Sequence, residues 1–197
     1  MARAMTERHP RLAPLAALAL GACSVQPAPD PGPERVVEPR VSDLPAPRGA
    51  GLLREAMMRG HDRARAEAGV PPLTWDPALV ASARAYAEEL ARSGRFEHSA
   101  QLRGRFPEGE NLWRGTRRDY TYSEMIGHWV AERAMFTRGP APNFSVTGRG
   151  GDVTHYAQII WRTTRSVGCA TASNSRDDVL VCRYSPAGNV IGRDPLE

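Results

Sequence analysis

The chain has 197 residues with 26 basic and 22 acidic side chains, and its formal net charge is +4. This length accommodates one ordinary domain with additional segments, and the composition is that of a globular protein rather than collagen or a coiled coil. The positive excess is small, every basic residue is an arginine, and the arginines are interspersed with acids. We therefore expect no nucleic-acid partner.

The first 22 residues have the pattern of a secretory signal. Arginines precede a short apolar run over residues 12–22, which is too short to span a bilayer as a finished helix. The run leads into Leu-Gly-Ala-Cys at residues 20–23, which resembles a bacterial lipobox, in which the cysteine is diacylated and becomes the first mature residue. We expect residues 1–22 to be a lipoprotein signal peptide and Cys23 to carry lipid. An ordinary signal peptide with an incidental cysteine is the alternative.

Residues 23–50 are rich in proline, with few large apolar groups and charges of both signs. This composition favours extended polyproline-like conformations over a packed core, so we expect a disordered tether. The tether would join a membrane anchor at Cys23 to a domain spanning residues 51–197. We accordingly expect a lipid-anchored protein of the bacterial cell envelope, periplasmic or surface-exposed, or a secreted protein if Cys23 carries no lipid.

Two helices are predicted at the start of this domain. Apolar residues at helical spacing predict the first over residues 51–68. Asp76 is a good N-cap and Pro77 suits the first helical position, so a second helix begins there and ends at Gly94. The next segment, residues 95–118, contains three glycines and a proline. We interpret it as mostly loop.

A third helix is predicted over residues 122–136, with Thr121 or Ser123 as its cap. At 100° per residue, its apolar stripe contains Glu132 at the centre. A carboxylate on an apolar face costs free energy unless it is partnered or protonated, so Glu132 marks a candidate site. An ion pair between Glu132 and an arginine in the core is the alternative.

Strand signals follow a glycine- and proline-rich loop, at residues 156–161, 167–173 and 179–184. If the polar turn between the last two is centred on its midpoint, Cys169 and Cys182 lie opposite each other on an antiparallel pair. A disulfide is then geometrically reasonable in an exported protein, and two buried thiols are the alternative. Helices followed by strands predict an α+β fold, with a small antiparallel sheet covered by helices.

Two histidines and two glutamates are candidates for a metal site. His98 follows the second helix and His155 begins the first predicted strand, whereas Glu110 lies between a glycine and an asparagine. Two imidazoles with one or two carboxylates, Glu132 included, are the donors of a catalytic zinc site. The sequence contains no His-Glu-x-x-His signature, and these distant segments are not brought together by the sequence alone.

Two further histidines have simpler interpretations. His128 and Glu132 are four residues apart on one helix, so they are a rival ligand set or, more simply, a local helix interaction. His61 lies among charged residues and is interpreted as a surface or helix-packing residue.

Seven segments carry a family resemblance. In chain order they read HDRARAEAGVPPLTWDPAL, FEHS, GENLW, HWVAE, THYAQIIW, SVGCA and CRYSPAGNVIG. Together they resemble the CAP superfamily of cysteine-rich secretory proteins, venom antigen 5 and plant pathogenesis-related proteins of class 1, with its bacterial SCP-domain members. The match covers the chain from about residue 51 to its end. It implies an α-β-α sandwich with a three-stranded antiparallel sheet.

The resemblance also implies a common cleft for the four candidates. The family's cavity carries two histidines and two glutamates, which correspond motif by motif to His98, Glu110, Glu132 and His155. In relatives the two histidines can bind a divalent ion such as zinc, with the glutamates near its water. This chain departs from the family beside the second histidine, where Thr154 replaces a glycine and Ala157 replaces a threonine. The departures should alter local hydrogen bonds but not the ligands.

Three functions compete. CAP relatives are proposed to bind sterols, fatty acids or proteins, which favours a binding module for a hydrophobic small molecule or a protein partner. Aromatic residues could line its groove, although buried aromatics are usually core: Trp113, Tyr120, Tyr122, Tyr156 and Trp161. A zinc hydrolase would instead use metal-bound water with Glu110 or Glu132 as general base. The third possibility is a polar core network with incidental metal binding.

Overall fold

The structure is a computed structural model that describes residues 35–37, 44–100 and 108–197. The expected signal peptide, Cys23 and most of the expected tether lie outside the described residues. Within the described part of the chain, no helix is both long enough and apolar enough to cross a membrane.

The sheet contains five strands in the order β1-β3-β5-β4-β2. Its centre is antiparallel and consists of β3 (Gly109–Thr116), β5 (Asp177–Ser185) and β4 (Ser166–Ser173). Two short edge strands pair in parallel, β1 (Arg35–Val36) with β3 and β2 (Thr74–Trp75) with β4. The fold is α+β as predicted. Because the sheet is mixed and five-stranded, the expected three-stranded antiparallel sheet is not confirmed.

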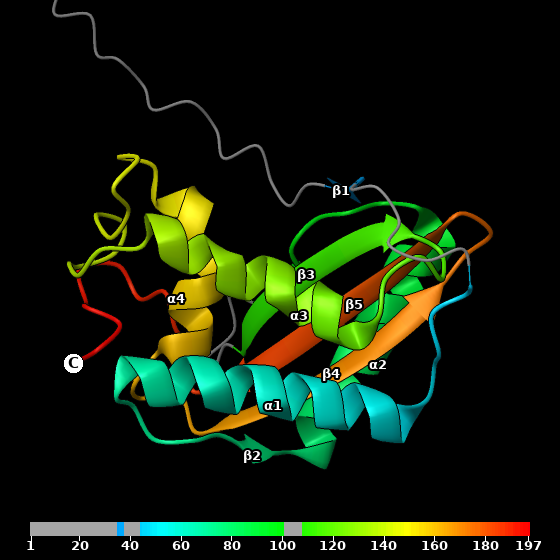
Figure 1. Cartoon of the computed structure of the whole chain (residues 1–197), viewed down its shortest axis with the longest axis horizontal. Coiled ribbons are helices and arrows are strands. Elements are labelled where there is room, and N and C mark those ends of the chain that lie inside the picture. The colour runs from blue at the N-terminus through cyan, green and yellow to red at the C-terminus, as the bar shows by residue number, and fades with distance from the viewer. Residues whose placement is uncertain (1–34, 38–43, 101–107) are drawn as a thin grey trace, which may run out of the picture.

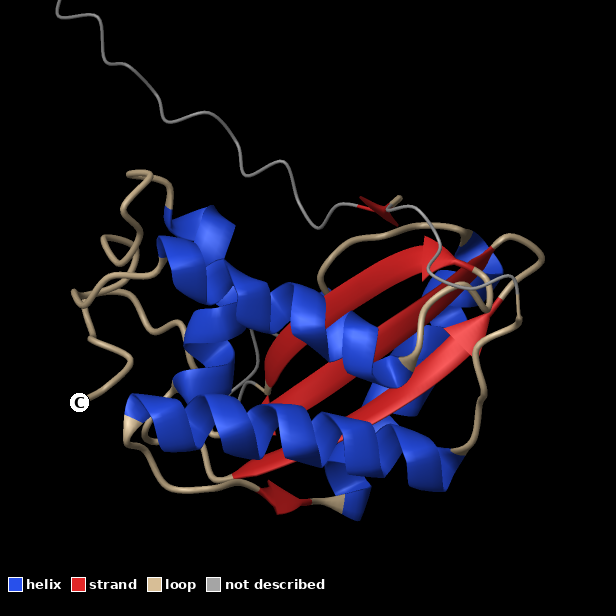
Figure 2. Ribbon diagram, in the orientation of Figure 1, coloured by secondary structure: helices blue, strands red, loops and turns tan. Residues whose placement is uncertain are grey.

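Helices cover both faces of this sheet, as Figures 1 and 2 show. On one face lie α1 (Ala50–Ala68), α3 (Tyr122–Ala131) and the short α4 (Thr154–Ile160). On the other face lies α2 (Pro77–Ser93), which packs on β4 and β5. The layers therefore enclose two cores, one on each side of the sheet.

The central strand β5 contributes to both cores because its side chains alternate between faces. Leu180 and Cys182 belong to the core beneath α1 and α3, whereas Val179 and Val181 pack with α2. Cys182 lies opposite Cys169 in the β4–β5 register, and the two form a disulfide with Cα atoms 4.1 Å apart. The predicted disulfide is confirmed, and the alternative of two thiols is wrong.

The first two helices follow the sequence prediction. α1 begins one residue earlier than expected, and the carboxylate of Asp76 accepts the N–H of Ala78 at 2.8 Å to cap α2. Gly69 and Gly94 end the two helices in left-handed conformations, which glycine adopts without a steric penalty.

The third helix begins as predicted and ends early. Thr121, not Ser123, is its cap, and it forms a capping box with Glu124. The helix ends at Ala131, and the chain tightens into a 3₁₀ turn over Glu132–Met135. The predicted continuation of the α-helix to residue 136 is therefore wrong.

The prediction that residues 95–118 are mostly loop missed β3, which takes up residues 109–116. Two glycines of this strand are required by close packing rather than by turns. A Cβ on Gly109 would overlap the side-chain amide of Gln158, and a Cβ on Gly115 would overlap the ring of Trp113. At these two positions the side chains of Gln158 and Trp113 lie so close to the strand backbone that only glycine fits.

The predicted strand at residues 156–161 is also wrong, because the segment belongs to α4. All side chains from Tyr156 to Trp161 are buried. A short apolar run that is buried on every side has no polar face, so its periodicity does not distinguish a helix from a strand.

Arg65 is a fully buried cation on α1. Its guanidinium donates to four backbone carbonyls, those of Pro71 at 2.5 Å, Ile159 at 2.8 Å, Trp161 at 2.9 Å and Thr164 at 3.2 Å. Burial lowers the pKa of Arg65 to about 10, so the side chain stays charged at neutral pH. It satisfies carbonyls at the end of α4 that have no helical partner.

His61, one turn before Arg65 on α1, is buried and neutral. Its Nδ1 donates to the carbonyl of Met57 at 2.7 Å, and its Nε2 accepts from the Tyr184 hydroxyl at 2.9 Å. Burial lowers the pKa of His61 to about 4. Of the two interpretations offered by the sequence, helix packing is confirmed and the surface position is wrong.

Candidate functional site

A cleft with a volume of about 350 Å³ opens where β3 begins. His98 and Glu110 line it together with His155, which lies in the first turn of α4. The segment after β5 closes the cleft with residues 187–190. Of the four candidates, three line this cleft, and Glu132 lies behind His155.

Side-chain alternation along β3 connects the cleft to both layers. Glu110 points toward the α2 side, where its partner Arg183 lies over the ring of Tyr86 at 5.2 Å. The next residue, Asn111, points to the opposite side. Its Nδ2 donates to the carbonyl of His155 and to the Tyr184 hydroxyl, both at 3.1 Å. The adjacent residues Glu110 and Asn111 therefore hold side-chain and backbone groups in place on both sides of the cleft.

The first histidine is oriented by a buried glutamate. His98 Nδ1 donates to Glu110 Oε1 at 2.7 Å, and the backbone N–H of Ser99 donates to the same oxygen at 3.0 Å. Glu110 Oε2 lies 2.8 Å from Arg183 Nη2, in an ion pair whose angles do not suit a hydrogen bond. The Glu110 side chain is wholly buried, so this ion pair stabilises its charge.

The second histidine is oriented in the same way. His155 Nδ1 donates to Glu132 Oε1 at 2.5 Å, and the N–H of Tyr156 donates to Glu132 Oε2 at 3.0 Å. The ring of Trp129 stacks on the His155 ring, with centroids 5.7 Å apart. Glu132 thus also binds an otherwise unpaired N–H in the first turn of α4. Glu132 is thus partnered by His155, whereas the alternative was an ion pair with an arginine in the core.

The two His–Glu pairs leave the same atom for a ligand. With Nδ1 bound to a carboxylate, each imidazole has Nε2 available, as in histidines that bind metals. Within the described ranges, no group of three or more histidine, cysteine, aspartate or glutamate side chains is arranged to hold a metal ion. The cleft therefore offers at most the two imidazoles, His98 and His155, as nitrogen ligands.

The rival set of His128 and Glu132 does not form such a pair. His128 Nδ1 accepts a hydrogen bond from the indole N–H of Trp113 at 2.9 Å, and the two rings stack. Glu132 Oε1 is bound to His155 instead. His128 therefore packs against the core, and Glu132 belongs to the cleft.

Arg183 and Asn111 are site residues that sequence reasoning did not identify. Arg183 is 1% exposed, which is unusual for an arginine in a chain with many surface arginines. A signal was present in both cases, since Asn111 follows Glu110 directly and Arg183 follows the apolar run of residues 179–182 within β5.

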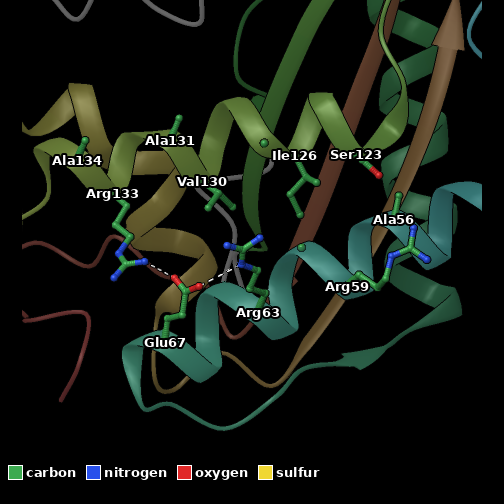
Figure 3. Close-up of a pocket in the computed structure, with 12 residues that line it drawn as sticks. Ala56, Arg59, Arg63, Glu67, Ser123, Ile126, Val130, Ala131, Arg133 and Ala134 are labelled. Carbon is green, nitrogen blue, oxygen red and sulfur yellow. Dashed lines mark hydrogen bonds and ion pairs between the residues drawn. The ribbon is translucent and has the colours of Figure 1, made fainter.

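A larger groove, with a volume of about 920 Å³, lies between α1 and α3 on the outer surface (Figure 3). Its apolar wall is formed by Ile126 and Val130, and its rim carries arginines. Glu67 binds both Arg63 and Arg133, as the dashed lines in Figure 3 mark. The groove is therefore apolar inside and basic at its edge.

Two glycines shape this groove in opposite ways. A Cβ on Gly60 would overlap the side chain of Ile126, so Gly60 allows α1 and α3 to approach closely. A Cβ on Gly127 would meet no atom within 4 Å, so the helix surface is open at that position. The aromatic residues considered as groove lining are instead at least 95% buried in the core: Trp113, Tyr120, Tyr122, Tyr156 and Trp161.

Comparison with known proteins decides the family. The model of the cysteine-rich secretory protein family, CAP, matches residues 58–184. The chain belongs to the CAP family. Tobacco (Nicotiana tabacum) pathogenesis-related protein 1C is 37% identical over 136 residues, which are 68% of this chain and 76% of that protein. A pathogenesis-related protein 1 of Arabidopsis thaliana is 34% identical over 70% of this chain and 79% of its own length.

Solved structures show the CAP fold for this chain as well. NaASP2, whose crystal structure is described with Zn²⁺, has a TM-score of 0.61 at 20% identity and covers 76% of this chain and 88% of its own. BmVAL-1 has a TM-score of 0.59 at 22% identity and covers 77% and 86%. At these identities the likeness concerns the fold alone.

Proposed function

We propose that this CAP-domain protein is a binding module whose α1–α3 groove takes an amphipathic ligand with an acyl chain and an anionic head. We propose further that it is exported and anchored to the bacterial envelope through a lipid on Cys23. The mass of the protein extracted from membranes, compared with that of Cys23→Ala, tests the anchor. The observation that carries the binding function is an open apolar groove edged by arginines.

The inside of the groove suits a hydrocarbon chain. Both helices present small residues to the groove, and Val130 lines its wall with Ile126. Each methylene removed from water contributes about 0.8 kcal/mol, so a long chain binds usefully without polar contacts. Apart from the Ser123 hydroxyl, the residues between the charged groups of the rim are apolar or glycine, which favours a hydrocarbon chain over a carbohydrate or a peptide backbone.

The rim suits an anionic head. Arg59, Arg63 and Arg133 line the groove, and Glu67 is shared by the last two. All these ion pairs are solvent-exposed, so each stabilises the fold by at most about 1 kcal/mol. A ligand carboxylate can therefore replace Glu67 at one guanidinium at little cost.

Gly127→Leu is expected to weaken binding of a dansyl-labelled fatty acid at least tenfold. The new side chain would project into open space within the groove and occupy the path of the acyl chain. Leucine has a higher helix propensity than glycine, so α3 should be stabilised rather than lost. Fluorescence titration measures the affinity, and thermal unfolding monitors the fold.

Ala85→Leu is the matched control. Ala85 also lies on a helix and is exposed, but it lines neither the groove nor the cleft. Its affinity for the same probe should equal that of the parent. Equal affinity of Gly127→Leu and the parent would place the ligand elsewhere and overturn the groove assignment.

A second candidate function is weak binding of a divalent ion by the cleft. It is supported by the paired orientation of His98 and His155, which leaves Nε2 of each available to a ligand. The zinc hydrolase has less support. Glu110 Oε1 and both oxygens of Glu132 accept hydrogen bonds within the protein, and Glu110 Oε2 is ion-paired with Arg183, so action as a general base would disturb contacts that orient the two histidines.

His98→Ala combined with His155→Ala should abolish zinc binding measured by calorimetry. Affinity of the parent should be weak, because a stable protein zinc site normally has three or four protein ligands. Glu132→Gln keeps both imidazoles but weakens the Nδ1 hydrogen bond, and a loss of about 10- to 100-fold is expected there. Retention of the parent's zinc stoichiometry by the folded double variant would exclude the site.

A further inference from the structure

A second surface cavity, with a volume of about 580 Å³, lies at the start of α1, between this helix, α2 and β4. Its lining includes three arginines, Arg48, Arg54 and Arg84, together with the aromatic rings of Trp75 and Tyr122. None of the residues that line it is an aspartate or a glutamate. We call it the Arg54–Arg84 pocket.

Two of these arginines carry uncompensated charge. Arg54 and Arg84 form no ion pair with any carboxylate in the described part of the chain, and the first turn of α1 has no acidic residue. Farther along the same helix, Arg59 pairs with a glutamate four residues away, and so does Arg63. Unlike these two arginines, Arg54 has no carboxylate within ion-pair distance among the described residues.

The third arginine forms a fixed wall. Arg48 pairs with the buried Asp178, donates to the carbonyl of Pro47 at 3.0 Å and lies 5.1 Å from the ring centroid of Tyr122. Beside it, Gly49 and Gly51 present bare backbone, and a Cβ on either would meet no atom within 4 Å. The pocket is thus rigid on one side and has room for a ligand.

We propose that the Arg54–Arg84 pocket binds an organic phosphate or sulfate ester. Two guanidinium groups in one concave site repel each other, and an oxyanion placed between them converts that repulsion into charge-assisted hydrogen bonds. Arginine is well suited to tetrahedral oxyanions because its planar fork donates two parallel bonds. The partly exposed ring of Trp75 offers a face for the organic part of the ligand.

Calorimetric titration of the full chain with pyrophosphate and with glucose 6-phosphate tests this pocket. We expect saturable binding by the parent and at least tenfold weaker binding by Arg54→Gln combined with Arg84→Gln. Arg92→Gln combined with Arg176→Gln removes the same charge from exposed positions that do not line the pocket, and it should bind like the parent.

Sedimentation with phosphatidylglycerol vesicles distinguishes the source of the ester. Vesicle binding that glucose 6-phosphate displaces, and that the Arg54/Arg84 variant loses, assigns the pocket to a lipid headgroup. Binding of the soluble probes without vesicle binding assigns it to a free ester. The proposal is overturned if the parent binds neither probe nor vesicles, if the Arg54/Arg84 variant binds like the parent, or if both double variants are weakened equally.

Discussion

Arg65→Met is expected to lower the free energy of unfolding by about 3–5 kcal/mol, because each buried carbonyl that loses its donor costs about 1–3 kcal/mol. Methionine fills a similar volume but donates no hydrogen bond. Of the four carbonyls that Arg65 binds, those of Ile159 and Thr164 would remain buried without this donor, whereas Pro71 is exposed and the Trp161 carbonyl also accepts the N–H of Thr164. Two of them, Ile159 and Trp161, lie at the end of the helix that carries His155, so the loss should also loosen that helix.

Chemical denaturation monitored by circular dichroism measures this effect. Arg63→Met is the matched control, since Arg63 lies on the same helix and its side chain is 84% exposed in a surface ion pair. It should change the free energy of unfolding by no more than about 0.5 kcal/mol. Similar losses in the two variants would show that the buried hydrogen bonds of Arg65 do not contribute to stability.

Acidification from pH 7 to pH 4 should remove about 3 kcal/mol of stability through His61 alone. Its pKa falls from 6.5 to about 4 on folding because the imidazole is buried. Between these values the unfolded chain binds a proton that the folded chain excludes, so stability falls as the pH falls through this window. Above pH 6.5 the imidazole is neutral in both states and the penalty is absent.

His61→Gln isolates this contribution. The amide can still donate to the Met57 carbonyl and accept from Tyr184, but it does not titrate. The variant should be less stable at pH 7, and its free energy of unfolding should vary less between pH 7 and pH 4. The difference between the two profiles is the quantity to compare, and parallel profiles would contradict the assignment of His61 as the buried titrating group.

Local signals predicted the first two helices because the signals and the packing agree there. Asp76 caps α2 in the structure as the sequence indicates, and Gly94 ends it. The errors occur where neighbouring elements override the local signal. Gly109 was taken for a turn residue, but it is a strand residue lying under Gln158. No pattern within β3 itself contains that information, because the constraint comes from α4.

Some residues of the candidate site could be predicted from the sequence, and others could not. Periodicity alone singled out Glu132, because a carboxylate in an apolar stripe violates the pattern of an amphipathic helix. His98 and Glu110 were candidates by residue type, but only the family resemblance predicted that they share one cleft, since they meet through side-chain contacts that no local pattern shows. Arg183 was missed because its burial depends on Glu110, which is distant in sequence.

Because β5 belongs to both cores, it determines how the domain unfolds. Every residue of this strand except Ser185 is buried, and it pairs on both sides, with β3 and with β4. Separating α2 from the sheet would expose one face of the same strand whose other face supports α1 and α3. The two layers therefore share one cooperative unit, and the β5 amides should exchange with solvent deuterium only when the entire domain unfolds.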